Sequence, residues 1–200
     1  MTLRKRTLLV IVLILLALIL VIYAISSLVV LRSFADLERE YVYQNVQRVI
    51  NALSDDLVQL HSTLGDWSSW DDTYTFAVGE NDIYVENNLM DETFANLRIS
   101  LMLFLNNDGQ VVYGKGFDLI EEQEIPIAPD WQQYFVQSAP LSHHANVESQ
   151  SSGLVLFPEG SFLVASRPIL DSFNEGPIHG TLIMGRYLGT EEIERLESTT

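Results

Sequence analysis

The chain has 200 residues, no cysteine and a formal charge of −16. After residue 31, 8 Lys and Arg stand against all 27 Asp and Glu, a net charge of −19. Such a surface repels nucleic acid and anionic headgroups, which excludes both as partners. An acidic surface of this kind fits either divalent-cation binding or simple solubility. Without cysteine, the fold depends on its hydrophobic core rather than on disulfides.

An apolar segment without any charged side chain occupies residues 8–31. As a helix it would be roughly 36 Å long, enough to cross a hydrocarbon core of about 30 Å. A buried core helix and a cleaved signal peptide are the alternatives, although the apolar region of a signal peptide is usually about 7–15 residues long. The basic run 4–6 precedes the segment, and such residues stay in the cytoplasm. We therefore predict a cytoplasmic tip at 1–7, one helix across the inner or plasma membrane at 8–31, and an extracytoplasmic domain at 32–189.

A heptad-like apolar pattern follows the predicted span. Apolar residues recur at alternating intervals of four and three up to Trp67, and charged residues such as Asp55 and Asp56 are expected to fall away from this seam. The pattern fits an amphipathic helix on its own domain's sheet, and it also fits a coiled coil between two copies. We expect one helix to do both along its length. The predicted homodimer contacts are Val46, Ile50, Leu53, Leu57 and Leu60.

Beyond Trp67 the pattern changes to short apolar runs separated by turn residues. The run Asn106-Asn107-Asp108-Gly109 between two apolar segments is a strong β-hairpin signal. A Pro-Glu-Gly turn at 158–160 indicates a second hairpin. The predicted strands are 99–105, 110–114, 154–157, 162–169 and 180–187.

Helices and a loop complete the pattern. A short helix is predicted at 131–136, a polar loop at 138–152, and a helix that begins at Thr190 with acidic residues in its first turn. The order is a long helix, an aromatic segment, about five antiparallel strands and a further helix. This order predicts an α+β fold with one antiparallel sheet packed on the long N-terminal helix.

The aromatic segment reads Asp-Trp-Ser-Ser-Trp-Asp-Asp-Thr-Tyr from residue 66 to residue 74. Together with Ser-Arg-Pro-Ile at 166–169, Gly-Thr-Leu at 180–182 and Gly-Arg at 185–186, it resembles the fourth class of CHASE domains. These are extracellular sensors associated with cyclases and histidine kinases in prokaryotes, and the resemblance covers roughly residues 60–190.

The resemblance implies a Cache/PAS-like fold, a second membrane span downstream, and a cytoplasmic kinase or cyclic-dinucleotide effector such as a diguanylate cyclase. The expected C-terminal helix at 190–200 would lead toward that span, which these 200 residues do not contain. The implied function is an extracytoplasmic ligand sensor that relays the binding of an unknown small molecule through transmembrane helices. The alternative is a single-span envelope assembly protein whose exported domain binds another protein.

Two explanations fit the aromatic and acidic cluster. The indoles and carboxylates would either seal a helix against the sheet and cap backbone amides, or line a ligand pocket. Two strand arginines need partners, because an unpaired guanidinium among apolar residues is costly. A salt bridge to Asp71 or Asp72 would satisfy them, and so would a ligand carboxylate. We expect the cluster and the arginines to surround one pocket, with Arg167 holding the ligand. The predicted ligand-binding residues are Trp70, Asp71, Asp72, Tyr74, Arg167 and Arg186.

No set of residues points to catalysis. The sequence has no G-x-S-x-G elbow, P-loop, G-x-G-x-x-G or H-E-x-x-H motif. The adjacent pair His143-His144 is expected to lie in a solvated loop rather than to bind a metal. We therefore expect no enzyme, cofactor or metal site in this segment. An anchored hydrolase is the least supported alternative, because no nucleophile and base can be paired.

Overall fold

The computed structural model describes the backbone of residues 3–198 and the side chains of residues 3–9, 11–27 and 38–195. The chain divides into two compact units, residues 1–50 and 51–200. Parts of four predicted segments lie outside the described residues: positions 1–2 of the tip, the side chains of 10 and 28–31 in the span, the side chains of 32–37 in the extracytoplasmic domain, and the side chains of 196–198 with positions 199–200 in the last helix.

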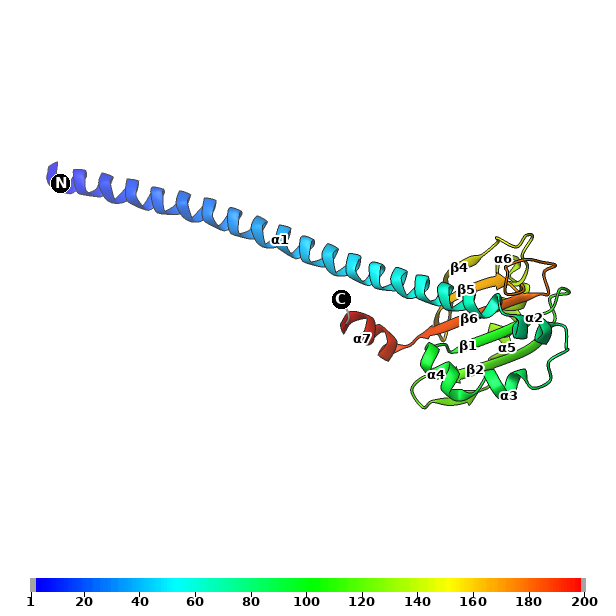
Figure 1. Cartoon of the computed structure of the whole chain (residues 1–200). Helices are drawn as coiled ribbons and strands as arrows, with labels where there is room; N and C mark the ends of the chain where they lie inside the picture. The colour runs from blue at the N-terminus through cyan, green and yellow to red at the C-terminus, as the bar shows by residue number, and fades with distance from the viewer. Residues whose placement is uncertain (1–2, 199–200) are drawn as a thin grey trace. The chain divides into compact units, whose positions relative to one another are not determined.

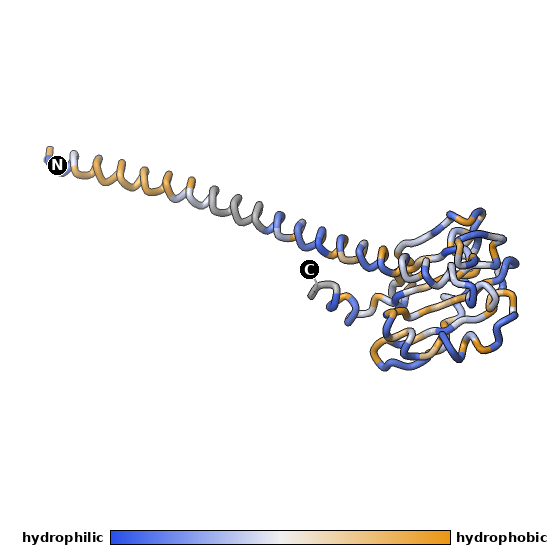
Figure 2. Tube along the Cα trace, viewed as in Figure 1, coloured by the Kyte–Doolittle hydropathy of each residue, from blue (hydrophilic) through white to orange (hydrophobic). Residues whose placement is uncertain are grey.

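The first unit belongs to one continuous helix, α1 (Leu3–Ser68). By length and composition, Leu3–Ser27 could cross a membrane, and none of its most apolar stretch is buried. Figure 2 shows this run of apolar residues near the N-terminus. A candidate span therefore lies where the sequence predicts one, while its insertion and orientation stay predictions.

The second unit is built around a six-stranded antiparallel sheet with the order β3-β2-β1-β6-β5-β4 (Figure 1). All five predicted strands are present. The sequence analysis missed β3, which at three residues is too short to show an alternating pattern. The strands are β1 (Leu101–Leu105), β2 (Val111–Asp118), β3 (Gln123–Ile125), β4 (Ser151–Phe157), β5 (Gly160–Pro168) and β6 (Thr181–Leu188).

The predicted turn between β1 and β2 is confirmed. The Oδ1 atom of Asn106 accepts hydrogen bonds from the backbone N–H groups of Asp108 (3.0 Å) and Gln110 (2.9 Å). Gly109 has a φ of +74°, which glycine adopts without a steric penalty. The side chain of Asn106 and the flexibility of Gly109 together set the tight connection.

Within residues 3–198, six further helices accompany the strands. The helix predicted at 131–136 is α5, and the helix predicted from Thr190 is α7. The loop predicted at 138–152 is wrong at both ends, because Pro140 lies in the first turn of α6 and a polar stretch joins the edge strand β4. These helices are α2 (Asp71–Ala77), α3 (Tyr84–Asn88), α4 (Asp91–Leu97), α5 (Pro129–Gln137), α6 (Ala139–Ser142) and α7 (Thr190–Ser198).

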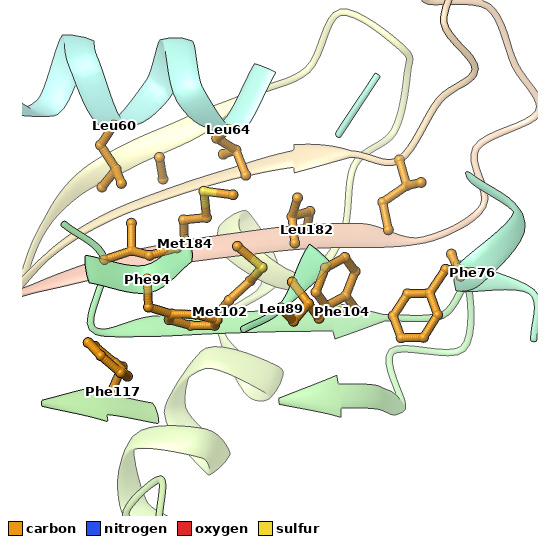
Figure 3. Packing of buried hydrophobic residues seen from close by; sticks show 14 of the residues in the cluster. Leu60, Leu64, Phe76, Leu89, Phe94, Met102, Phe104, Phe117, Leu182 and Met184 are labelled. Atoms are coloured by element: carbon orange, nitrogen blue, oxygen red, sulfur yellow. The ribbon is translucent and has the colours of Figure 1, made fainter. Parts of the chain in front are cut away.

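Both faces of the sheet are covered, so β1 is buried at every position. Met102 and Phe104 pack with residues of α1 to α4, whereas Leu101 and Leu103 pack with α5 and α6. Figure 3 shows Leu60 and Leu64 of α1 reaching down to Met184 and the sheet. This is an α+β Cache/PAS-like fold, as predicted.

The heptad-like seam divides into two parts. Leu60 is 1 % exposed and lies in the domain core, with Leu53 and Leu57 packed against the same core. The predicted dimer contact through Leu60 is therefore wrong, because its own sheet covers that side chain. Val46 and Ile50 are 53 % and 52 % exposed. A homodimer through these two residues stays a prediction.

Replacing Leu60 by Ala should lower the free energy of unfolding by about 2–5 kcal/mol, because a cavity opens where α1 meets the sheet. Val58→Ala is the matched control, since this side chain lies two positions away on α1 and is exposed. We expect less than about 0.5 kcal/mol for the control. Urea unfolding of the chain in detergent, followed by near-UV circular dichroism, measures both. Equal losses would contradict the packing of Leu60.

Candidate functional site

Charged side chains from separate segments meet near the C-terminal end of β6. Asp56 of α1 accepts Nη1 of Arg186 at 3.0 Å and Nη2 of Arg195 at 2.5 Å on the same oxygen, Oδ2. Arg186 lies in β6 and is 1 % exposed, and Arg195 belongs to α7. One carboxylate therefore joins α1 to the central sheet and to the last helix.

Glu192 of α7 is the second carboxylate of this group and pairs with two arginines. Its Oε1 accepts Nε and Nη2 of Arg195 at 2.9 and 2.7 Å, and its Oε2 accepts Nη2 of Arg98 at 2.5 Å. Burial alone would raise the pKa of Glu192, but the hydrogen bond from Arg195 and the charges of Arg98 and Arg195 lower the pKa below its usual value. Glu192 is therefore an anion at neutral pH. We call Asp56, Arg98, Arg186, Glu192 and Arg195 the ionic cluster.

The backbone after α4 completes the cluster. Nε of Arg186 donates to the carbonyl of Arg98 at 2.7 Å, and its Nη2 donates to the carbonyl of Leu97 at 3.4 Å. Arg98 has a φ of +53° and ends α4, a position that usually takes Gly or Asn. The left-handed turn presents both carbonyls to Arg186. The buried guanidinium therefore has one carboxylate and two backbone carbonyls as partners.

A cavity of about 590 Å³ lies beside the ionic cluster. This volume is in the usual range for a small-molecule site. One wall consists of three aromatic rings in mutual contact. The ring of Phe162 lies 4.8 Å from that of Trp131 and 5.2 Å from that of Tyr187. Another wall is charged. The remaining lining residues are Arg98, Ser100, Phe117, Asp118, Leu119, Ile120, Ile125, Gly189, Glu191, Glu192 and Arg195.

A second, smaller cavity of about 240 Å³ has His143 and His144 in its lining. His144 is buried, and its Nε2 lies 3.2 Å from the hydroxyl of Ser166. Burial, with the neighbouring charges of His143 and Arg167, lowers the pKa of His144 to about 4. The expectation of a solvated loop is therefore wrong for His144, since its imidazole packs against β5 as a neutral group.

The predicted aromatic residues lie on a bend between two helices. The helix α1 ends at Ser68 and α2 begins at Asp71, so Trp70 lies between the two helices. Trp70 contacts Trp67 and Tyr84 at ring distances of 5.9 and 6.0 Å. These contacts join the indole of Trp70 to the core on the α1 side of the sheet.

The neighbouring polar residues join this bend to the loop before β6. Oδ1 of Asp71 accepts the backbone N–H of Ser172 at 2.9 Å, and Asp72 is exposed. Tyr74 stacks on His179 at a ring distance of 3.7 Å and donates its hydroxyl to the carbonyl of Pro177. Through these contacts, Asp71 and Tyr74 hold the start of α2 against the loop that precedes β6.

The two strand arginines have different surroundings. Arg186 pairs with Asp56, so the salt bridge expected to Asp71 or Asp72 is wrong for Arg186. Arg167 lies over Gly65 of α1. A Cβ atom at position 65 would collide with Nη1 of Arg167. Within the part of the chain that the structure describes, Arg167 forms no ion pair. None of the six predicted residues lines the 590 Å³ cavity. Their role in ligand binding stays a prediction.

The sequence analysis missed Asp56 as a functional residue and placed it away from the seam. Asp56 lies three residues after Leu53 and four before Leu60, on the side of α1 that faces the core. An acid at such a position needs a buried partner. That spacing was the available signal, although the buried partner Arg186 lies in β6 and the second partner, Arg195, lies 139 residues further along the chain.

Comparison with known proteins agrees with this architecture. The model of the CHASE4 domain matches residues 52–200, which confirms the resemblance seen in the sequence. The methanogenesis regulatory histidine kinase FilI of Methanothrix harundinacea (strain 6Ac) is 37 % identical over 164 residues. This match covers 82 % of the chain and 18 % of FilI, so the chain spans less than a fifth of that relative.

A solved structure shares the fold. The extracellular domain of vpHK1S-Z8, which is described as a histidine kinase, superposes with a TM-score of 0.54 at 15 % identity. The match covers 78 % of this chain and 60 % of that domain. At this level of identity the likeness concerns the fold alone.

Replacing Asp56 by Ala should lower the free energy of unfolding by about 3–5 kcal/mol, because Arg186 is left buried without its counter-charge. Asp55→Ala removes an exposed carboxylate from the adjacent position and is expected to change stability by less than about 0.5 kcal/mol. Urea unfolding of both variants in detergent measures the difference. Similar stabilities would show that the pair with Arg186 does not hold α1.

Proposed function

The chain belongs to the CHASE4 domain family, and we propose that it is the extracytoplasmic ligand-sensing part of a membrane-bound receptor. The CHASE4 match and the histidine kinase relative support a sensory role in signal transduction. The receptor is anchored by the span near the N-terminus, with the tip at 1–7 in the cytoplasm. The kinase or cyclic-dinucleotide chemistry resides in a cytoplasmic module rather than in this segment.

The cavity beside the ionic cluster is the observation that carries this proposal. Its charged wall contains Arg98, Glu192 and Arg195, which also belong to the cluster that ties α7 to α1. A bound molecule would therefore contact the groups that position α7 relative to the sheet. A ligand shifts such an equilibrium only when it binds one arrangement more tightly than the other.

A single-span assembly protein is the second candidate function. The edge strand β4 exposes Leu154 and Leu156, the latter by 71 %, and an exposed apolar edge strand is a docking site for another chain. This observation favours a protein partner. Because it does not use the cavity, the two functions can be separated by experiment.

A thermal-shift screen of the purified chain in detergent tests the sensor proposal. A compound at 100 times its dissociation constant should stabilise the fold by about 2.7 kcal/mol. Trp131→Ala should abolish that gain, because this indole forms part of the aromatic wall. Tyr134→Ala is the control, because it removes an exposed ring from the same helix. This variant should keep the stabilisation by the compound. Stabilisation that survives in Trp131→Ala would place the binding site elsewhere and contradict a sensor that uses this cavity.

A further inference from the structure

The ionic cluster gathers most of the arginines of a strongly acidic domain. Residues 51–200 contain 5 Lys and Arg against 24 Asp and Glu. Three of those five basic residues, Arg98, Arg186 and Arg195, gather in the cluster, where the described ion pairs join them to Asp56 and Glu192. Arg98 and Arg195 also form part of the cavity wall.

The cavity wall also contains the carboxylates of Asp118 and Glu191. Oδ1 of Asp118 accepts the backbone N–H groups of Ile120 (2.8 Å) and Glu121 (3.2 Å) and closes its own turn. Glu191 is exposed at the start of α7, where water and salt screen its charge. The hydrogen bonds to Asp118 and the solvent around Glu191 weaken the repulsion of an anion by these two carboxylates, and Arg98 and Arg195 are the cations of the wall.

Arg98 is the guanidinium best placed to receive that anion. Its side chain is 44 % exposed, compared with 2 % for Arg186, whose donors face Asp56 and two backbone carbonyls. Among the described residues, Arg98 contacts a carboxylate only through Nη2, to Glu192. A guanidinium presents two planar forks, one from Nε and Nη2 and one from Nη1 and Nη2. Glu192 occupies one N–H of Nη2, so the fork on the other side remains for a two-point contact with a carboxylate or phosphate.

The backbone at Arg98 gives independent support. The residue adopts the left-handed conformation, with a φ of +53°, at the end of α4. Glycine fits that conformation without the Cβ penalty that any other L-residue pays. A strained residue held by its surroundings is typical of a functional position. The same residue offers its carbonyl to Arg186 and forms part of the cavity wall, so the turn connects the ionic cluster to the cavity.

We propose that the cavity binds a small molecule through an anionic group, a carboxylate or a phosphate, that Arg98 holds with support from Arg195. The apolar body of the molecule contacts Trp131, Phe162 and Tyr187. This inference rests on the sensor function proposed above and adds the chemical class of its ligand. The anion competes with Glu192 for Arg98, so binding loosens one of the contacts between α7 and the rest of the domain.

A matched set of probes tests the charge preference: phenylacetate, phenyl phosphate, benzylamine and benzyl alcohol. Binding to the ¹⁵N-labelled chain in detergent is read from the indole N–H signal of Trp131, which Trp131→Phe identifies. We expect at least one of the two anions to bind ten or more times more tightly than benzylamine. The stronger of the two anions identifies a carboxylate or a phosphate as the preferred group.

Arg98→Gly tests the residue without straining the backbone, since glycine suits its φ. This variant should lose at least tenfold in affinity for the anion and leave the affinity for benzyl alcohol unchanged, and Arg98→Lys should recover part of the loss. Glu122→Gly is the control, because it makes the same replacement at an exposed residue with a φ of +48° outside the cavity wall. It should bind all probes as the unmodified chain does.

Two results would overturn the proposal. The first is benzylamine binding as tightly as the anions, and the second is Arg98→Gly retaining full affinity for them. A cationic stabiliser found in the thermal-shift screen and lost in Trp131→Ala would overturn the anion preference but leave the sensor function supported. Stabilisation independent of Trp131 would contradict both proposals.

Discussion

The buried guanidinium of Arg186 in the central strand β6 is the constraint on which the surrounding structure depends. A charge removed from water costs several kcal/mol unless it is paired and hydrogen-bonded. The chain meets that requirement with Asp56 from α1 and with two carbonyls from the left-handed end of α4. The helix α1 and the end of α4 must therefore lie close to β6, which fixes how the long helix packs on the sheet.

The same constraint connects the fold to the proposed function. Asp56 shares its Oδ2 with Arg195, and Glu192 links Arg195 to Arg98 at the edge of the cavity. These contacts form a continuous chain of charged groups from α1 through α7 to the wall of the cavity. A sensor needs such a connection, because binding must change the relative stability of two arrangements of its helices.

Local patterns in the sequence predicted much of this fold and little of the site. Asn106 and Gly109 encode the first hairpin directly, and five of the six strands follow from apolar runs. The seam on α1 was recognised, although the spacing of Leu60 could not show whether a second copy or the domain's own sheet would cover it. The ionic cluster pairs residues far apart in the sequence, such as Asp56 and Arg195, which no local period reveals.

Hydrogen exchange of the backbone amides of α7 tests most directly whether the ionic cluster couples α1 to α7. Asp56→Asn keeps the shape of the side chain and removes its charge. We expect the amides of α7 to exchange faster in Asp56→Asn, together with those of α1 around position 56, and to remain unchanged in Asp55→Asn. Faster exchange in α1 with no change in α7 would contradict the coupling on which this account depends.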